Sequence, residues 1–285
     1  MGRREHHESE LAMSTAQTCP DADAEAGRIK PLSFLPALGI FLAIAIWNRL
    51  CIHNIIPFLE DRGMHQFSAY LAGFMLGLAP LLPVALVMLR QEGNPMTWAS
   101  MSNRLGFRSF GWRQFALMLG LTVVAFVATL LTSPTQSWIT DLSSWFQPGD
   151  VFHPLQDPTT SSDSLIDPSV DWMGPDAAGN WIWGVAIVAI FFLNIVGEEV
   201  LWRGVIFPRQ ELVHGERTWL VHGFMWYLFH LPFYPWFAIS GLPQAFILSY
   251  LFQKTKNTWL VLIMHTIFNS VFYVILLGIV LGVFT

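Results

Sequence analysis

Charged side chains are scarce in this sequence, and so are cysteines. Only 12% of the 285 residues are charged, against about 25% in an ordinary soluble domain, while 53% are hydrophobic. A single soluble core could not bury so much apolar surface, so we predict a membrane protein whose surface is covered by the lipid bilayer. The two cysteines, Cys19 and Cys51, exclude a disulfide framework. No basic stripe is present, so we predict no nucleic-acid partner.

The charge that is present gathers near the N-terminus. Residues 1–30 carry ten charged groups, six of them acidic, and no apolar segment typical of a signal peptide precedes Pro31. We therefore predict a disordered cytoplasmic tail over residues 1–30, followed by a transmembrane domain over residues 31–285.

Seven apolar runs are long enough to cross a bilayer, which takes roughly 20 helical residues. They cover residues 33–52, 67–89, 113–132, 181–200, 218–233, 237–253 and 257–284. The last run is long for one helix, and a break at Gly278 or Gly282 would give an eighth span. The predicted fold class is all-α, a polytopic transmembrane helical bundle of seven or eight spans.

Basic residues predict the orientation, because cytoplasmic loops are enriched in Lys and Arg. If the N-terminus is cytoplasmic, the predicted spans place twelve basic residues on the cytoplasmic side: Arg3, Arg4, Arg28, Lys30, Arg90, Arg104, Arg108, Arg113, Arg209, Arg217, Lys254 and Lys256. Residues 133–180 hold seven aspartates, six prolines and no Lys or Arg. We predict that they form an irregular external loop, and that the protein is integral to the cell membrane with its N-terminus in the cytoplasm.

Ionisable residues inside predicted spans cost at least a few kcal/mol each, so they indicate function or pairing. The fourth span ends with Glu198, Glu199 and Arg203. Glu199 and Arg203 are four residues apart and can pair on one helix face. Glu198 is rotated by roughly 100° from Glu199, which leaves it without that partner and available for chemistry.

Two later spans carry the other polar groups. His230 lies four residues after Trp226, and His265 lies four residues before Asn269, so each pair shares one helix face. Counted from the nearest basic residues, Glu198, His230 and His265 all lie roughly 13–20 Å along their helices. Each group alone could serve a salt bridge or a hydrogen bond between helices. Together they predict one polar, water-accessible cavity inside the membrane.

These residues resemble the motifs of a known family. Glu198-Glu199-x-x-x-Arg203, the helix of His230, and His265-x-x-x-Asn269 are similar to the three motifs of the CPBP family, the type II CAAX prenyl proteases and the Abi bacteriocin-processing proteases. The resemblance covers residues 180–275, which we take as the catalytic core. One position departs from it: the family has Phe where this chain has Trp226, and we expect altered packing there without loss of chemistry.

The resemblance implies an intramembrane endopeptidase with a catalytic cavity open toward the cytoplasm. It implies that Glu198 is the general base for water with help from His230, that His265 and Asn269 stabilise the oxyanion, and that Glu199 and Arg203 hold the local structure. No cofactor is required in this reading, although zinc stays an alternative, with Glu198, His230 and His265 as candidate ligands. The expected substrate is a membrane-associated peptide or protein, prenylated if the reaction is CAAX processing and unmodified if it is peptide or bacteriocin maturation. A non-catalytic membrane scaffold or immunity protein is the alternative function.

Overall fold

A computed structural model describes residues 29–149, 151–160, 164 and 166–284 of the chain. The chain divides into residues 1–30 and a compact unit over residues 31–285. The predicted disordered tail lies outside the described residues except for its last two positions. Within the described residues every regular element is a helix and none is a strand, which confirms the all-helical prediction.

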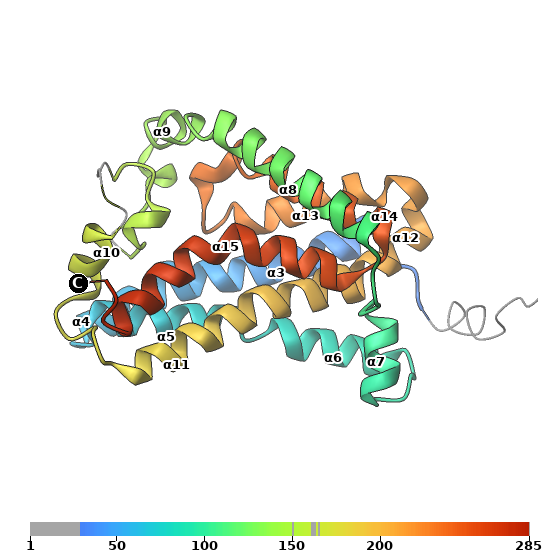
Figure 1. Ribbon diagram of the computed structural model, residues 1–285, viewed down its shortest axis with the longest axis horizontal. Helices are drawn as coiled ribbons and strands as arrows, with labels where there is room; N and C mark the ends of the chain where they lie inside the picture. The colour runs from blue at the N-terminus through green and yellow to red at the C-terminus, as the bar shows by residue number, and fades with distance from the viewer. Residues whose placement is uncertain (1–28, 150, 161–163, 165, 285) are drawn as a thin grey trace, which may run out of the picture. The chain divides into compact units, whose positions relative to one another are not determined.

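The first half of the compact unit holds three long helical stretches. Its elements are α3 (Phe34–Leu50), the π-helix η1 (Cys51–Ile55), α4 (Ile56–Asp61), α5 (Gln66–Leu78), α6 (Leu81–Gln91), α7 (Trp98–Arg104) and α8 (Trp112–Thr132). The helix of α3 runs on through η1 into α4 without a break. Figure 1 shows α3, α5, α11 and α15 lying along one direction, and α5 packs against both α3 and α11.

The second half begins with short helices and ends with long ones. Its elements are α9 (Thr135–Thr140), η2 (Ser144–Phe146), η3 (Pro154–Gln156), α10 (Asp167–Met173), α11 (Trp181–Phe191), η4 (Phe192–Val196), η5 (Glu199–Ile206), α12 (Phe207–His214), η6 (Gly215–Arg217), α13 (Thr218–His230), η7 (Pro235–Ala238), α14 (Leu242–Thr255) and α15 (Thr258–Val280). Helix α15 packs against α11, α14 and α8, and so occupies the middle of the bundle.

Five helical stretches are long and apolar enough to cross a membrane. They cover Phe34–Asp61, Gln66–Gln91, Trp112–Thr132, Trp181–His230 and Thr258–Val280. The fourth contains two of the predicted spans, which are separated by a turn at Gly215, where φ is +56°. Helix α14 has 14 residues and is shorter than a full span of roughly 20. The protein is therefore an all-helical membrane protein, and the total of seven or eight spans stays a prediction.

The last apolar run forms one helix. Helix α15 continues through Gly278 and ends at Val280, just before Gly282, whose φ of +69° is in the left-handed region. The break that we considered at Gly278 is therefore not present, because its backbone remains helical.

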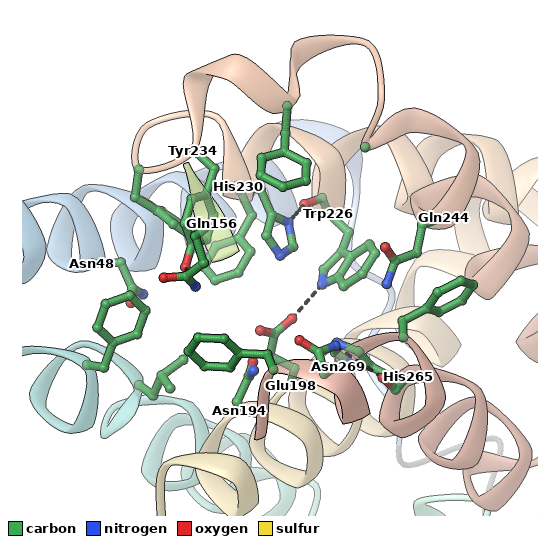
Figure 2. Close-up of a pocket in the computed structure, with 18 of the residues that line it drawn as sticks. Asn48, Gln156, Asn194, Glu198, Trp226, His230, Tyr234, Gln244, His265 and Asn269 are labelled. Atoms are coloured by element: carbon green, nitrogen blue, oxygen red, sulfur yellow. Dashed lines mark hydrogen bonds between the residues drawn. The ribbon is translucent and has the colours of Figure 1, made fainter. Parts of the chain in front are cut away.

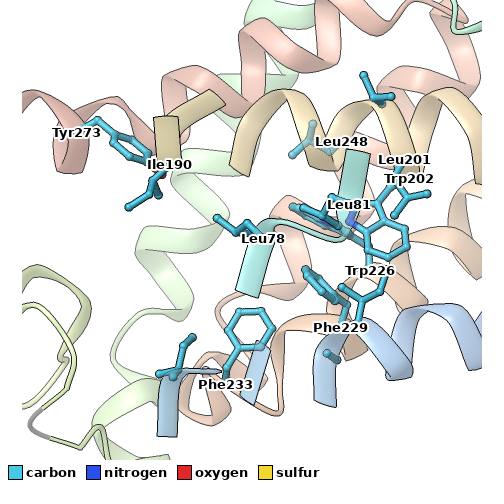
Figure 3. Packing of buried hydrophobic residues seen from close by; sticks show 14 of the residues in the cluster. Leu78, Leu81, Ile190, Leu201, Trp202, Trp226, Phe229, Phe233, Leu248 and Tyr273 are labelled. Carbon is cyan, nitrogen blue, oxygen red and sulfur yellow. The ribbon is translucent and has the colours of Figure 1, made fainter. Parts of the chain in front are cut away.

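The core of the bundle consists of aromatic and aliphatic side chains from many helices. Phe41 of α3 stacks on Trp202 of η5 with ring centroids 4.1 Å apart, and Trp202 also contacts Phe229 of α13. Figure 3 shows Trp202, Phe229 and Trp226 packed together. Gly223 allows α13 and α14 to approach closely, since a Cβ atom there would lie 3.1 Å from the Cα atom of Phe246. This packing fixes α13 beside the η5 segment.

Helix α8 presents an apolar face to the outside of the bundle. Leu130 and Leu131 are 72% and 75% exposed, and Val123 is 62% exposed. An apolar surface of this kind on one helix is unusual for a water-soluble monomer and is expected for a helix that faces lipid. The exposed side chains of α8 thus agree with an integral membrane protein.

Ion pairs join several helices at the end of the bundle that carries α7 and α12. Glu92 accepts hydrogen bonds from Arg104 at 2.7 Å and from Arg209 at 2.9 Å. Arg104 also donates to the backbone carbonyl of Gly204 at 2.9 Å, and so contacts the η5 segment directly. Lys256 pairs with Glu211 on the same end.

The segment predicted to be an irregular external loop is partly helical. Residues 133–180 contain α9, η2, η3 and α10, and these short helices pack on the bundle through buried Phe152, His153 and Met173. The prediction of an irregular loop was therefore wrong for α9, η2, η3 and α10, while the described residues between these helices are irregular. Its aspartates and prolines suggested solvated coil, but its Phe152 and His153 side chains bury against the helices. Its placement outside the cell stays a prediction.

Candidate functional site

The helix that carries Glu198 is π-helical on both sides of that residue. Segment η4 precedes Gly197, and η5 begins at Glu199. In η5 the N–H of Phe207 bonds to the carbonyl of Trp202, five residues earlier, instead of four. This wider turn shifts the faces on which side chains lie, and π-helical turns occur frequently at functional sites.

Glu199 is fully buried in an ionic cluster behind the cavity. Its Oε1 atom accepts from Nη1 of Arg203 at 3.0 Å and from Nδ1 of His265 at 2.7 Å. Glu199 and Arg203 are both 0% exposed. The predicted pairing of Glu199 with Arg203 is confirmed. Sequence reasoning did not foresee that His265 joins the same carboxylate, because the two lie 66 residues apart.

Glu198 has a different environment from its neighbour. Its Oε2 atom accepts a hydrogen bond from the indole N–H of Trp226 at 2.8 Å. The centroid of the same indole ring lies 4.1 Å from the guanidinium carbon of Arg203, in cation–π geometry. Trp226 therefore does more than fill space: a phenylalanine at this position could not donate to Glu198.

The hydrogen bonds of His230 determine which ring nitrogen carries the proton. Nδ1 lies 2.8 Å from the backbone carbonyl of Trp226, and a carbonyl can only accept. The proton of the neutral ring is therefore on Nδ1, and Nε2 keeps its lone pair. Figure 2 shows the His230 ring pointing into the pocket, toward Glu198.

Asn269 lies one turn after His265 on α15. Its Nδ2 group donates to the backbone carbonyl of His265 at 3.1 Å, and both side chains face the pocket. They share one helix face, as the spacing of four residues predicted. Figure 2 shows both side chains close to Glu198.

One cavity of about 310 Å³ brings together the residues of all three motifs. Four of the predicted site residues line it, namely Glu198, His230, His265 and Asn269. Glu199 and Arg203 do not line it and lie behind it. The structure thus places the six residues in one region but in two environments, a cavity wall and a buried ionic cluster.

Neutral polar side chains that were not among the predicted site residues also line the cavity. They are Asn48, Tyr70, Gln156, Asn194, Tyr234, Gln244 and Tyr273. Asn194, which precedes Glu198 by one turn, donates to the hydroxyl of Tyr273 at 3.1 Å. An isolated amide inside an apolar run, such as Asn48 or Gln244, was the available signal in the sequence. Gln156 gave none, because it lies in a polar segment.

Tyr234 and His153 lie near the cavity but outside the spans. Burial raises the pKa of the Tyr234 phenol above its usual range, so its hydroxyl is neutral and can both donate and accept a hydrogen bond. Burial lowers the pKa of His153 to about 3, so this imidazole is neutral near pH 7.

The candidate zinc ligands do not form a three-ligand group. Among the described residues, no three His, Cys, Asp or Glu side chains are grouped so that they could hold a metal ion. Glu198, His230 and His265 line the same cavity, and Nδ1 of His265 bonds to Glu199 while Nδ1 of His230 bonds to a backbone carbonyl, which leaves Nε2 as the atom of each ring that could reach a metal. Among the described residues these three therefore form no preformed ligand group, and a metal-independent reaction stays a prediction.

Comparison with known proteins identifies this region of the chain. Residues 180–271 match the family model described as type II CAAX prenyl endopeptidase Rce1-like. No curated protein and no solved structure matches the chain significantly. The matched residues contain all three motifs, with Glu198, His230 and Asn269, and they end within helix α15. Residues 180–271 thus match an Rce1-like domain, and this match supports the resemblance of the chain to the CPBP family.

Proposed function

We propose that this protein is an intramembrane endopeptidase that hydrolyses a peptide bond with a water molecule activated by Glu198. The observation that carries the proposal is the single cavity lined by Glu198, His230, His265 and Asn269. The match to an endopeptidase family supports it. Proton acceptors and donors that meet in one cavity are the groups that amide hydrolysis requires.

Glu198 is the proposed general base. Trp226 holds its Oε2 atom, so Oε1 is the oxygen left to accept a proton from water. Nε2 of His230, with its lone pair, holds the second hydrogen of the same water. As Glu198 takes the proton, the water oxygen bonds to the carbonyl carbon of the substrate, and the carbonyl electrons move to its oxygen.

His265 and Asn269 are the proposed donors to that oxyanion. Because Nδ1 of His265 is bonded to Glu199, only Nε2 can reach the substrate. Nε2 donates only when the ring is protonated, and the Glu199 carboxylate beside it compensates the imidazolium charge. A fixed donor in a low-dielectric cavity stabilises the tetrahedral intermediate more than water could.

Collapse of the intermediate completes the reaction. Glu198 returns the proton to the amide nitrogen, the C–N bond breaks, and the products are a carboxylic acid and an amine. Each step uses only groups that line the cavity. We therefore propose a mechanism that runs through Glu198 and not through a metal.

The end of the bundle with α7 and α12 is the proposed cytoplasmic side. Arg104 and Arg209 share Glu92 there, and Lys256 pairs with Glu211 nearby. Their positive charges support a cytoplasmic N-terminus by the positive-inside rule. The cavity also receives Leu155 and Gln156 from the segment proposed to be external. The direction in which the cavity opens therefore stays a prediction.

The substrate is proposed to be a membrane-associated peptide or protein. The test is to compare the termini of membrane proteins, by mass spectrometry, in cells with the wild-type protein and with Glu198→Gln. New C-termini after cysteine, absent from the variant, indicate CAAX-type processing. Other lost cleavage sites indicate peptide or bacteriocin maturation.

A matched control tests whether cleavage depends on the Glu198 carboxylate in particular or is lost when any carboxylate is removed. Glu211 pairs with Lys256 in a partly exposed ion pair away from the cavity, so Glu211→Gln should cleave as the wild type does. Identical termini in wild-type and Glu198→Gln cells would overturn the protease proposal. A cell phenotype that survives Glu198→Gln would instead favour a non-catalytic scaffold or immunity protein.

A further inference from the structure

Gln156 reaches the cavity from the short helix η3 and bonds to two tyrosines. The hydroxyl of Tyr70 donates to its Oε1 atom at 3.0 Å. Its Nε2 group donates to the hydroxyl of Tyr234 at 2.9 Å. The three residues are 86 and 78 positions apart in the chain, so this arrangement is built by the fold and not by local sequence. Figure 2 shows Gln156 and Tyr234 on the side of the cavity that faces Glu198.

The two hydroxyls together recognise a carboxamide. One donates to a C=O group and the other accepts from an N–H group, and a peptide bond offers the same two groups. Because Tyr234 is neutral, its hydroxyl can act as the acceptor. Most of the remaining lining is aromatic or aliphatic, including Phe74, Phe233 and Phe237. A pair of polar groups in an apolar wall is typical of a site that fixes the orientation of a ligand.

The segment that carries Gln156 is anchored beside the cavity by its own side chains. His153 is 0% exposed and its ring contacts Trp172 and Phe272, with centroids 4.9 and 5.2 Å apart. Phe152 packs against Tyr234 and Trp236. The backbone at Gln156 therefore has a defined position beside the cavity, from which its side chain reaches the two tyrosines.

We propose that Tyr70 and Tyr234 form a subsite for a main-chain peptide group of the substrate, and that Gln156 fills this subsite until substrate displaces it. The inference rests on the proposed peptidase function and deepens it. It assigns the tyrosine side of the cavity to substrate binding and leaves the chemistry to the Glu198 carboxylate. The ligand class is a neutral, extended peptide. Removal of the glutamine amide frees both hydroxyls for the substrate.

The kinetic test uses a peptide that contains a cleavage site identified by the comparison of termini. Gln156→Met keeps the length of the side chain and removes both hydrogen bonds, so KM should fall by about fivefold or more. In the Gln156→Met background, Tyr70→Phe and Tyr234→Phe should each raise KM by roughly 2- to 13-fold, with a smaller effect on kcat. Tyr250→Phe, in a tyrosine of α14 that packs on Trp219 outside the cavity, is the control.

A binding test separates this inference from the peptidase proposal. The probe is acetyl-trialanine amide, a blocked neutral peptide, titrated into purified Glu198→Gln protein by isothermal calorimetry. Adding Gln156→Met should tighten binding, and adding Tyr70→Phe to that protein should weaken it. If the probe binds as expected but the wild-type protein cleaves nothing in cells, the subsite is retained and the peptidase function is rejected. The subsite proposal would be overturned if KM for cleavage stayed unchanged in the variants of Gln156, Tyr70 and Tyr234. It would also be overturned if the affinity for the probe stayed unchanged in them.

Discussion

Replacing Glu199 by glutamine removes one buried charge and little else. The new amide keeps an oxygen that can accept from both Arg203 and His265. Its neighbour Arg203 is fully buried, and its Nε and Nη2 groups have no hydrogen-bond partner among the described residues. The Glu199 carboxylate is therefore the main compensation for the guanidinium charge, and the substitution isolates that electrostatic contribution.

The expected effect on stability is large. Removing one partner of a buried ion pair costs about 3–5 kcal/mol, because the remaining charge stays in a medium of low dielectric constant. In a chain of this size 1 kcal/mol shifts the melting temperature by about 2–4 °C. The Glu199→Gln protein should therefore unfold roughly 6–20 °C below the wild type.

Thermal unfolding of purified protein in one detergent, followed by intrinsic fluorescence, measures this shift. Two matched variants give the scale. Glu198→Gln keeps an acceptor for Trp226 and should change the melting temperature little, while it abolishes cleavage. Glu211→Gln breaks a partly exposed pair, worth about 0–1 kcal/mol. A Glu199→Gln protein that melts within about 2 °C of Glu211→Gln would refute the argument that Glu199 compensates Arg203.

Three further predictions concern the cavity and its surroundings. Trp226→Phe should lower kcat/KM for cleavage by roughly 5- to 150-fold, because loss of the indole N–H leaves a buried carboxylate oxygen of Glu198 without a hydrogen bond, at a cost of about 1–3 kcal/mol. Unchanged kinetics would show that this hydrogen bond does not position the Glu198 carboxylate. The free energy of unfolding should fall as the pH drops from 6.5 toward 3. Over this range His153 binds a proton in the unfolded chain but stays neutral in the folded protein, where its pKa is about 3. Its contribution, at most about 1.4 kcal/mol per pH unit, should be absent from the pH dependence of unfolding in His153→Gln. Dialysis against a zinc chelator should leave the cleavage rate of the purified enzyme unchanged; a loss that added zinc restores would contradict the proposed route through Glu198.

The residue pattern predicted the site well where spacing along a helix decides geometry. Glu199 and Arg203, four residues apart, do pair, and His265 and Asn269 do share a face. The separation of Glu198 from its neighbour also follows from helix rotation. These relations depend on local geometry alone, so one sequence was enough to find them.

The rest of the site depends on contacts between distant segments. The bond from Trp226 to Glu198 and the insertion of Gln156 are set by how α13 and η3 pack on other elements, and no periodicity in the chain signals either. Hydropathy located the apolar runs but not their ends. It separated residues 181–200 from 218–233, whereas the intervening residues continue as helix until Gly215.

The hydrogen bond from Arg104 to the carbonyl of Gly204 has a consequence for the chemistry. A π-helical turn is less regular than an α-helical one, and an outside donor to one of its carbonyls stabilises the widened form. Arg104 is in turn held by Glu92 at the basic end of the bundle. Arg104 thereby helps to set the helical pitch of the segment that begins beside Glu198, so the orientation of the proposed general base depends on ionic contacts at the basic end of the bundle.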